Sequence, residues 1–168
     1  MKQILETARL TLREMTIDDL DFISSMLAHP EVMRYYPKCY SREEAEAWVE
    51  RQIGRYASHG HGLWLVSDKE TMTPVGQVGL APHIVDGVEE AEVGYLIHRP
   101  FWRRGLASEA AAGVRDYAFG VLAKPRVISL IRPENTPSQA IARRIGMSPE
   151  KRTIFADLEH IVFALAKT

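Results

Sequence analysis

The chain has 168 residues, of which 46% are hydrophobic and 26% charged, and its formal net charge at pH 7 is −1. This length and balance are typical of one globular domain, so we expect residues 1–168 to form a single domain. The near-zero charge excludes a broad basic surface for nucleic acid, and the single cysteine excludes a disulfide framework or a cysteine-rich zinc site. Because no apolar run approaches ~20 residues, we expect a cytoplasmic protein without a membrane span.

The first part of the chain is predicted to contain a strand, two helices and then three strands. Thr16 precedes an apolar stripe of helical spacing, and Ser41 with Glu44 forms a capping box, so each marks the start of a helix. Alternation of apolar and polar residues marks the strands. The expected elements are a strand at 9–15, helices at 17–28 and 42–59, and strands at 60–68, 74–84 and 89–98.

The second part is predicted to alternate helices and strands before a final pair of strands. Small residues line one side of the pattern at 104–121, and Gly146 is a natural helix stop. The expected elements are helices at 104–121 and 135–145 and strands at 125–132, 147–155 and 158–166. Because the strands cluster, the pattern indicates an α+β fold with a mixed, mainly antiparallel sheet of about six to seven strands and about four helices.

The segment "HRPFWRRGLASEAA", residues 98–111, stands between a predicted strand and a predicted helix. The N-terminus of a helix exposes unpaired N–H groups, and glycine lets the backbone approach a ligand closely. Arg103 and Arg104 add charge-assisted hydrogen bonds, so the segment is suited to a diphosphate. The ordinary alternative is that Gly105 serves helix–strand packing between solvated arginines.

Several further segments, taken with this one, resemble the GNAT superfamily of N-acetyltransferases, and specifically its RimJ/RimL-type branch. They are "ETARLTLREMTIDDLDFI", "HPEVMRYYP", "PVGQVGL", "AEVGYLIHRPFWRRGLASEA" and "NTPSQAIARRIGM". Their order and spacing match the family over nearly the whole chain. The family signature Q/R-x-x-G-x-G/A has Trp102 in its first place here, whereas Gly105 and Ala107 fit it. The resemblance implies the three-layer α/β/α GNAT fold.

The resemblance also implies a site for acetyl-CoA as cosubstrate, without a metal. The diphosphate is expected on the backbone of the turn that is here Arg103–Ser108, which includes Arg104, Gly105, Leu106 and Ala107. The pantetheine arm is expected to pair like a strand with Leu96, Ile97 and His98, where the family's strands often splay apart. Asn135 and Ser138 are expected to face this arm and the thioester sulfur.

The chemistry requires a neutral amine, a donor for the developing oxyanion and a proton for the departing thiolate. Glu92 is the first candidate for the base, directly or through water, although a solvated acidic patch with Glu89 and Glu90 is the alternative. A backbone N–H near Ile97 or His98 is the expected oxyanion donor. The usual family tyrosine four residues before Gly146 is replaced by Ala142, so Ser138 becomes the candidate acid, or else a binding residue.

Other residues are weaker candidates. His59 and His61 suggest a metal but are typical of a glycine-rich turn, and Cys39 is a thiol without a neighbouring histidine. Tyr35, Tyr36 and Trp64 are candidates for an acceptor pocket or for ordinary packing. We expect Trp48 to lie in the core.

The expected activity is transfer of an acetyl group from acetyl-CoA directly to a primary amine, with a protein N-terminal α-amine as the first candidate. Small amines, polyamines and antibiotics are alternative acceptors. A CoA-binding sensor module without catalysis is the alternative of another class. We expect no direct nucleic-acid or membrane partner. Homodimers are common in the branch that the chain resembles, but the sequence alone does not fix the oligomeric state.

Overall fold

Eight strands form one sheet in the order β1-β2-β3-β4-β5-β6-β8-β7 in the computed structural model, which describes residues 2–168. Only β5 and β6 run parallel, and all other neighbouring strands are antiparallel. The predicted α+β class with a mixed, mainly antiparallel sheet is therefore confirmed. The strands are β1 Gln3–Glu6, β2 Leu10–Arg13, β3 Leu63–Asp68, β4 Pro74–Val85, β5 Val88–Ile97, β6 Arg126–Ile131, β7 Ser148–Phe155 and β8 Leu158–Ala166.

The expected count of six to seven strands was too low because β1 was missed. This strand has only four residues and lies at the edge of the sheet, where it pairs with β2 alone. Its register shifts between Gln3 and Leu5, and its two adjacent apolar residues break the alternation that identifies a strand. Its pairing with β2, rather than an alternating sequence pattern, makes it a strand.

Four α-helices were expected, and the structure has α1 Leu20–Leu27, α2 Arg42–His59, α3 Leu106–Gly120 and α4 Thr136–Arg144. Both predicted N-caps are present, because Thr16 and Ser41 each accept hydrogen bonds within a capping box. Thr16 caps a short 3₁₀ turn that leads into α1. A left-handed Gly60 ends α2, and a left-handed Gly105 precedes α3.

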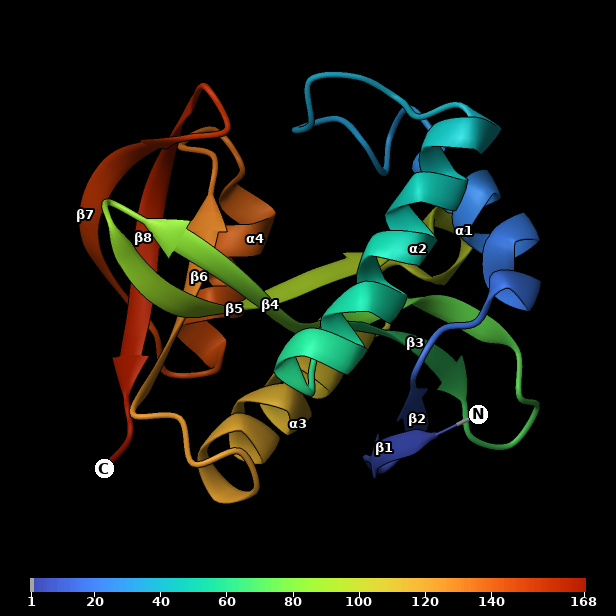
Figure 1. The fold of residues 1–168 in the computed structure, drawn as a ribbon, viewed down its shortest axis with the longest axis horizontal. Coiled ribbons are helices and arrows are strands. Elements are labelled where there is room, and N and C mark those ends of the chain that lie inside the picture. The colour runs from blue at the N-terminus through green and yellow to red at the C-terminus, as the bar shows by residue number, and fades with distance from the viewer. Residues whose placement is uncertain (1) are drawn as a thin grey trace.

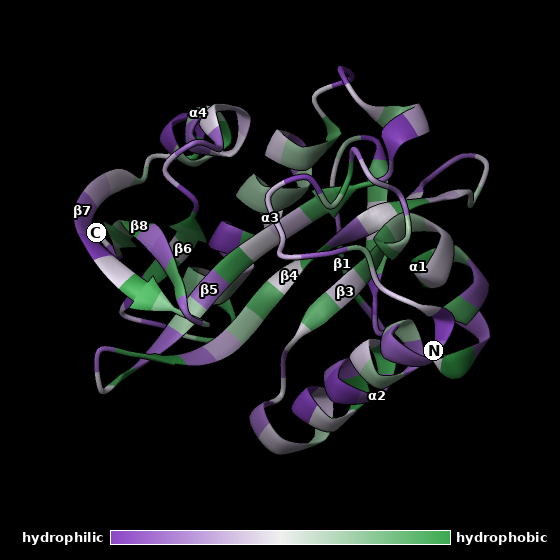
Figure 2. Cartoon of the chain, turned by 90° about the horizontal axis from the view of Figure 1, so that it is seen from above, coloured by the Kyte–Doolittle hydropathy of each residue, from purple (hydrophilic) through white to green (hydrophobic). Residues whose placement is uncertain are grey.

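The helices form two layers, one on each face of the sheet. One core lies between the sheet and α1 with α2, and a second lies between the sheet and α3 with α4. Figure 1 shows α1 and α2 near β1–β3, with α4 beside β6–β8 and α3 running behind α2. In Figure 2, hydrophilic residues mark much of α2, whereas β3 and β4 carry long apolar stretches in the interior. This is the expected three-layer α/β/α arrangement.

The two outer strands of the sheet differ in length. At one edge is the short β1, and at the other is the eight-residue β7, most of whose residues are exposed. The pairing of β7 with β8 is interrupted by a register shift between Pro149 and Lys151. None of the helices in residues 2–168 is long and apolar enough to cross a membrane.

Candidate active site

The neighbouring strands β5 and β6 separate soon after they meet. Their only paired residues are Glu92 and Ile128. Beyond this point, side chains replace the ladder: Ser129 Oγ donates to the Val93 carbonyl at 2.7 Å, and the Leu130 N–H donates to Glu92 Oε2 at 2.7 Å. We call the space between residues 93–97 of β5 and 129–131 of β6 the β5–β6 gap. Such a gap leaves backbone groups available to an extended ligand.

Backbone donors of β5 are directed towards this gap, and the N–H of Ile97 is the one at the end of the strand. In an antiparallel pair, successive residues alternate between facing the partner strand and facing away from it. The His98 N–H donates to the Val75 carbonyl at 2.9 Å, so it is occupied by β4. By the same alternation, the Ile97 N–H faces away from β4. Of the two expected oxyanion donors, Ile97 is therefore the one that is free.

The turn before α3 presents a row of backbone N–H groups, which we call the amide cradle, residues 103–108. In residues 2–168, the N–H groups of Arg103, Arg104 and Gly105 make no hydrogen bond. Those of Leu106, Ala107 and Ser108 begin a helix and have no acceptor within it, since the Glu109 N–H is the first to bond back, to Gly105. The cradle, with the positive end of the α3 dipole, suits a diphosphate.

The shape of the cradle depends on two left-handed residues. Gly105 has φ +74° and Arg103 has φ +64°. Glycine adopts this conformation without steric cost, whereas Arg103 stores strain there. Arg103, Arg104 and Gly105 are all exposed, so the cradle is open to solvent. The guanidinium of Arg104 lies over the Phe101 ring at 5.7 Å and leaves its amide uncovered.

A half-buried carboxylate holds the cradle against the β1–β2 turn. Glu109 in the first turn of α3 accepts from Thr7 Oγ1 at 2.5 Å, from the Arg9 N–H at 2.9 Å and from Arg9 Nε at 2.7 Å. Arg9 Nη1 donates to the Arg104 carbonyl at 2.9 Å. Burial alone would raise the pKa of Glu109, but the bonds from Thr7 and Arg9 lower it overall. These hydrogen bonds join the cradle to the β1–β2 turn and hold its backbone in place.

Helix α4 faces β5 with the two predicted residues at its start. Asn135 Oδ1 accepts from the Ser138 N–H at 3.2 Å and caps the helix, which leaves the Asn135 amide NH₂ free. The Ser138 hydroxyl makes no hydrogen bond in residues 2–168, whereas its carbonyl accepts from Tyr95 Oη at 2.7 Å. From the other end of α4, Arg144 Nη1 donates to Ser108 Oγ at 3.2 Å.

Glu92 lies where β5 and β6 meet, with both carboxylate oxygens engaged. Oε1 lies 3.0 Å from His83 Nε2, and Oε2 accepts from Leu130. Its side chain is 16% exposed, so it is not part of a solvated acidic patch. Glu90, one of the two neighbours expected in such a patch, is instead paired with Arg126 at 2.6 Å.

The structure gives positions for several of the weaker candidates. Trp64 is fully buried on the α3 side, with its ring edge-on to Tyr117 at 5.5 Å, so it does not line an acceptor pocket. Trp48 is in the core, as predicted, and its indole N–H donates to Gln77. His61 is buried, which lowers its pKa, and its Nδ1 lies 2.6 Å from the Leu80 carbonyl. In residues 2–168, no cluster of metal-ligating side chains is found. Cys39 is exposed and unpaired.

Four residues of the site were missed from the sequence. Arg9 and Arg144 approach the cradle from segments about a hundred residues and forty residues away, and His83 and Tyr95 gain their partners only through strand register and helix docking. For Tyr95 the sequence offered one signal, the alternation along β5, which places its side chain on the opposite face of the strand from Glu92.

The comparisons with known proteins agree with this geometry. The family model described as "Acetyltransferase (GNAT) domain" matches residues 9–148. The protein YkkB of Bacillus subtilis (strain 168) is 32% identical over 151 residues, 89% of this chain and 88% of YkkB. An acetyltransferase from Agrobacterium tumefaciens str. C58 has a TM-score of 0.87 at 28% identity, covering 99% of this chain and 95% of that one.

A second solved structure shares the fold at lower identity. RimL, a ribosomal L7/L12 alpha-N-protein acetyltransferase in complex with coenzyme A, has a TM-score of 0.79 at 17% identity and covers 98% of both chains. The chain belongs to the GNAT acetyltransferase family, as its RimJ/RimL-like motifs predicted. It is an N-acetyltransferase, and the family's acyl donor is acetyl-CoA.

Proposed function

We propose that the chain transfers the acetyl group of acetyl-CoA to the α-amine of a protein or peptide N-terminus. The observation that carries the coenzyme assignment is the amide cradle at the end of the β5–β6 gap. The cradle offers backbone donors for the diphosphate, and the gap offers the Ile97 N–H to an extended arm. The RimL structure, which has the same fold, was solved with coenzyme A.

In this proposal, each predicted cofactor residue has a position consistent with its role. Residues Arg103–Ser108 hold the diphosphate, with Arg144 adding a cation beside Ser108. Leu96, Ile97 and His98 form the strand end along the pantetheine arm. Leu96 contributes its side chain, because its backbone groups are paired with Gln77 of β4. The free amide NH₂ of Asn135 donates to the same arm.

Glu92 and Ser138 supply the proton transfers. Glu92 accepts the proton that the substrate ammonium must lose, directly or through one water, and the neutral amine then attacks the thioester carbonyl. The Ile97 N–H stabilises the oxyanion. The Ser138 hydroxyl gives its proton to the departing thiolate. It thereby takes the role that a tyrosine usually has in the family, at the position where this chain has Ala142.

An α-amine suits this site better than a polycation. An α-amine has an ordinary pKa near 8, whereas a lysine-like amine has one near 10.4, so the first needs less from its base. Glu92 lies at the start of the gap and accepts from Leu130, and the acidic residue Glu134 beyond the end of β6 is paired with Arg132 at 2.9 Å. A polyamine site needs several free carboxylates.

The test is turnover with acetyl-CoA against three acceptor sets: peptides with free N-termini, polyamines, and aminoglycoside or other small amines. Thiol release measures the rate, and mass spectrometry locates the acetyl group. We expect the highest kcat/KM for peptides, with acetylation at the α-amine. A matched peptide with a blocked N-terminus and an internal lysine should be inactive. Faster turnover of polyamines or small amines would overturn the proposed acceptor.

A further inference from the structure

We infer that His83 is the positioning residue for Glu92: it holds the carboxylate in place and makes acetyl transfer sensitive to the protonation of an imidazole. The inference rests on the proposed role of Glu92 as the base. His83 lies on β4 and Glu92 on the adjacent β5, with Nε2 3.0 Å from Oε1. His83 is separate from the amide cradle and from α4.

The carboxylate is held from both neighbouring strands. His83 of β4 contacts Oε1, and the Leu130 N–H of β6 donates to Oε2 at 2.7 Å. With both oxygens fixed, the carboxylate has one orientation. Each oxygen of a carboxylate accepts two hydrogen bonds, so one acceptor position on each remains for an amine or a water. The Leu130 bond alone would leave Oε1 free to rotate away.

The imidazole itself is held in place. The Phe155 ring of β7 packs against it edge-on, with centroids 4.9 Å apart. The side chain of His83 is 18% exposed. In residues 2–168, its second nitrogen, Nδ1, has no hydrogen-bond partner and is not buried. One nitrogen therefore faces the base, and the other is free to exchange a proton with solvent.

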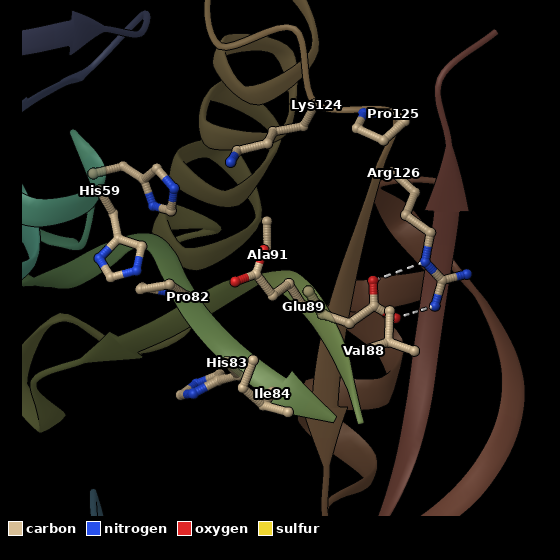
Figure 3. Close-up of a pocket in the computed structure, with 12 residues that line it drawn as sticks. His59, Pro82, His83, Ile84, Val88, Glu89, Ala91, Lys124, Pro125 and Arg126 are labelled. Atoms are coloured by element: carbon tan, nitrogen blue, oxygen red, sulfur yellow. Dashed lines mark hydrogen bonds and ion pairs between the residues drawn. The ribbon is translucent and has the colours of Figure 1, made fainter. Parts of the chain in front are cut away.

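A cavity of about 460 Å³ is lined in part by His83. Figure 3 shows His83 and Ile84 on β4 at the lower side of this cavity, with His59 and Lys124 across from them and Arg126 to one side. Arg126 is paired with Glu90. The cavity lies at the hairpin end of β4 and β5, whereas the amide cradle follows the other end of β5. Proton exchange at His83 does not depend on the coenzyme end of the gap.

The charged and titratable groups around the pair come from every neighbouring element. The phenols of Tyr36 and Tyr95 and the guanidinium of Arg55 lie within electrostatic reach of Glu92. On the His83 side, the groups are His59, His61, Glu89, Glu90, Lys124 and Arg126 around the cavity and His160 beyond Phe155. Within residues 2–168, none of these groups is hydrogen-bonded to the Glu92 carboxylate, whereas His83 is.

The contact between His83 and Glu92 makes the strength of Glu92 as a base depend on the charge of the imidazole. A neutral imidazole donates its Nε2–H to Glu92 and leaves the carboxylate able to accept a proton from the ammonium. An imidazolium adds a full positive charge at hydrogen-bond distance and weakens the carboxylate as a base. We therefore expect the pH dependence of the rate to respond to the removal of His83 as well as to the removal of Glu92.

The test compares His83→Gln and His83→Phe with the wild type in pH–rate profiles of kcat/KM for the acceptor. Glutamine keeps an N–H donor and does not titrate, so we expect near-normal activity at pH 8 and an acidic limb displaced by about one unit to lower pH. Phenylalanine removes the donor, so we expect kcat to fall up to about a hundredfold with KM for acetyl-CoA unchanged. His59→Gln, in the same cavity but without a contact to Glu92, is the matched control.

The outcomes separate the two proposals. If the wild type acetylates peptides and Glu92→Gln abolishes the acidic limb, the base assignment stands, and unchanged profiles in both His83 variants would overturn the positioning role alone. If Glu92→Gln is fully active with an unchanged profile, Glu92 is not the base and the inference falls with it. An effect of His83→Phe on folding is distinguished by the melting temperature and by His83→Gln, which keeps the hydrogen bond.

Discussion

Tyr95 of β5 and Ser138 of α4 are joined by a 2.7 Å hydrogen bond from the phenol to the Ser138 carbonyl. This bond crosses from the sheet to the first turn of the helix that carries the candidate acid. Burial raises the pKa of the Tyr95 phenol, and the charge of Glu92 raises it further. The phenol therefore stays protonated as a donor, and its contribution to stability is lost only as the pH rises above 10.0, the ordinary value.

Tyr95→Phe removes this bond between the sheet and the Ser138 carbonyl. We expect the free energy of unfolding to fall by about 1–2 kcal/mol and KM for acetyl-CoA to rise, because α4 is less firmly placed. Urea denaturation and initial-rate kinetics measure the two effects. Tyr117→Phe is the control, because the Tyr117 hydroxyl has no hydrogen bond in residues 2–168. Equal losses in both variants would show that the bond is unimportant.

Gly105→Asp places a negative charge in the amide cradle. We expect the affinity for acetyl-CoA to fall by at least about a hundredfold, roughly 3 kcal/mol, because the carboxylate repels the diphosphate. Isothermal titration calorimetry measures the change. Gly105→Asn separates charge from shape, since asparagine has a similar size and tolerates the left-handed backbone.

A second control uses a glycine of the same conformation elsewhere. Gly87 has φ +79° in the β4–β5 hairpin, and nothing lies near the position of an added Cβ. Gly87→Asp should therefore leave coenzyme binding unchanged. Retained affinity in Gly105→Asp, or an equal loss in Gly87→Asp, would contradict the cradle as the diphosphate site.

Glu109→Gln tests the network that holds the cradle. The lowered pKa of Glu109 means that its ionised form stabilises the fold above the ordinary value of 4.5, and that this contribution is lost as the pH falls through the lower, folded-state value. We expect the variant to be less stable by about 2 kcal/mol at pH 7 and to lose coenzyme affinity. The stability difference from the wild type should shrink below pH 4.5.

Thermal melts across pH 3–8 measure this difference, and Asp116→Asn is the control on the same helix. Asp116 is 70% exposed and pairs only with its neighbour Arg115. A stability difference for Glu109→Gln that does not depend on pH would mean that the carboxylate is not held in its charged form.

Ser138→Ala distinguishes an acid from a binding residue. If the hydroxyl protonates the thiolate, we expect kcat to fall by about a hundredfold with little change in KM for acetyl-CoA. Steady-state kinetics with the best peptide acceptor measure both constants. Thr136→Ala removes an exposed hydroxyl from the same helix and should change neither. A rise in KM alone would make Ser138 a binding residue.

Much of the fold could be predicted because its elements carry local signals. The Ser41 capping box and the Gly60 stop define α2, and its predicted range is the observed one. Gly105 and Gly146 likewise marked the start of α3 and the stop of α4. The short edge strand β1 carried no alternation, and only its pairing with β2 reveals it.

The candidate site was only partly predictable for a different reason. The cradle is a local backbone feature, so the sequence indicates it as a candidate anion site, and the resemblance to the GNAT family is what assigns it to acetyl-CoA. Its supports are not local: Arg9 reaches Arg104 across 95 positions, and His83 reaches Glu92 because of the strand register. Trp64, a candidate for the acceptor pocket, lies on the α3 side of the sheet. Alternation in the sequence places a side chain on one face of a strand but does not say which helices cover that face.

The blunt outer edges of the sheet also decide where new strands can be added. β1 offers only four residues, and β7 carries the register shift at Pro149, together with Lys151 and Arg152 on its exposed edge. Short length, irregular register and positive charge are the features that protect sheet edges against the addition of further strands. The β5–β6 gap has none of these protections, which is consistent with the proposal that a strand-like ligand is added in the middle of the sheet.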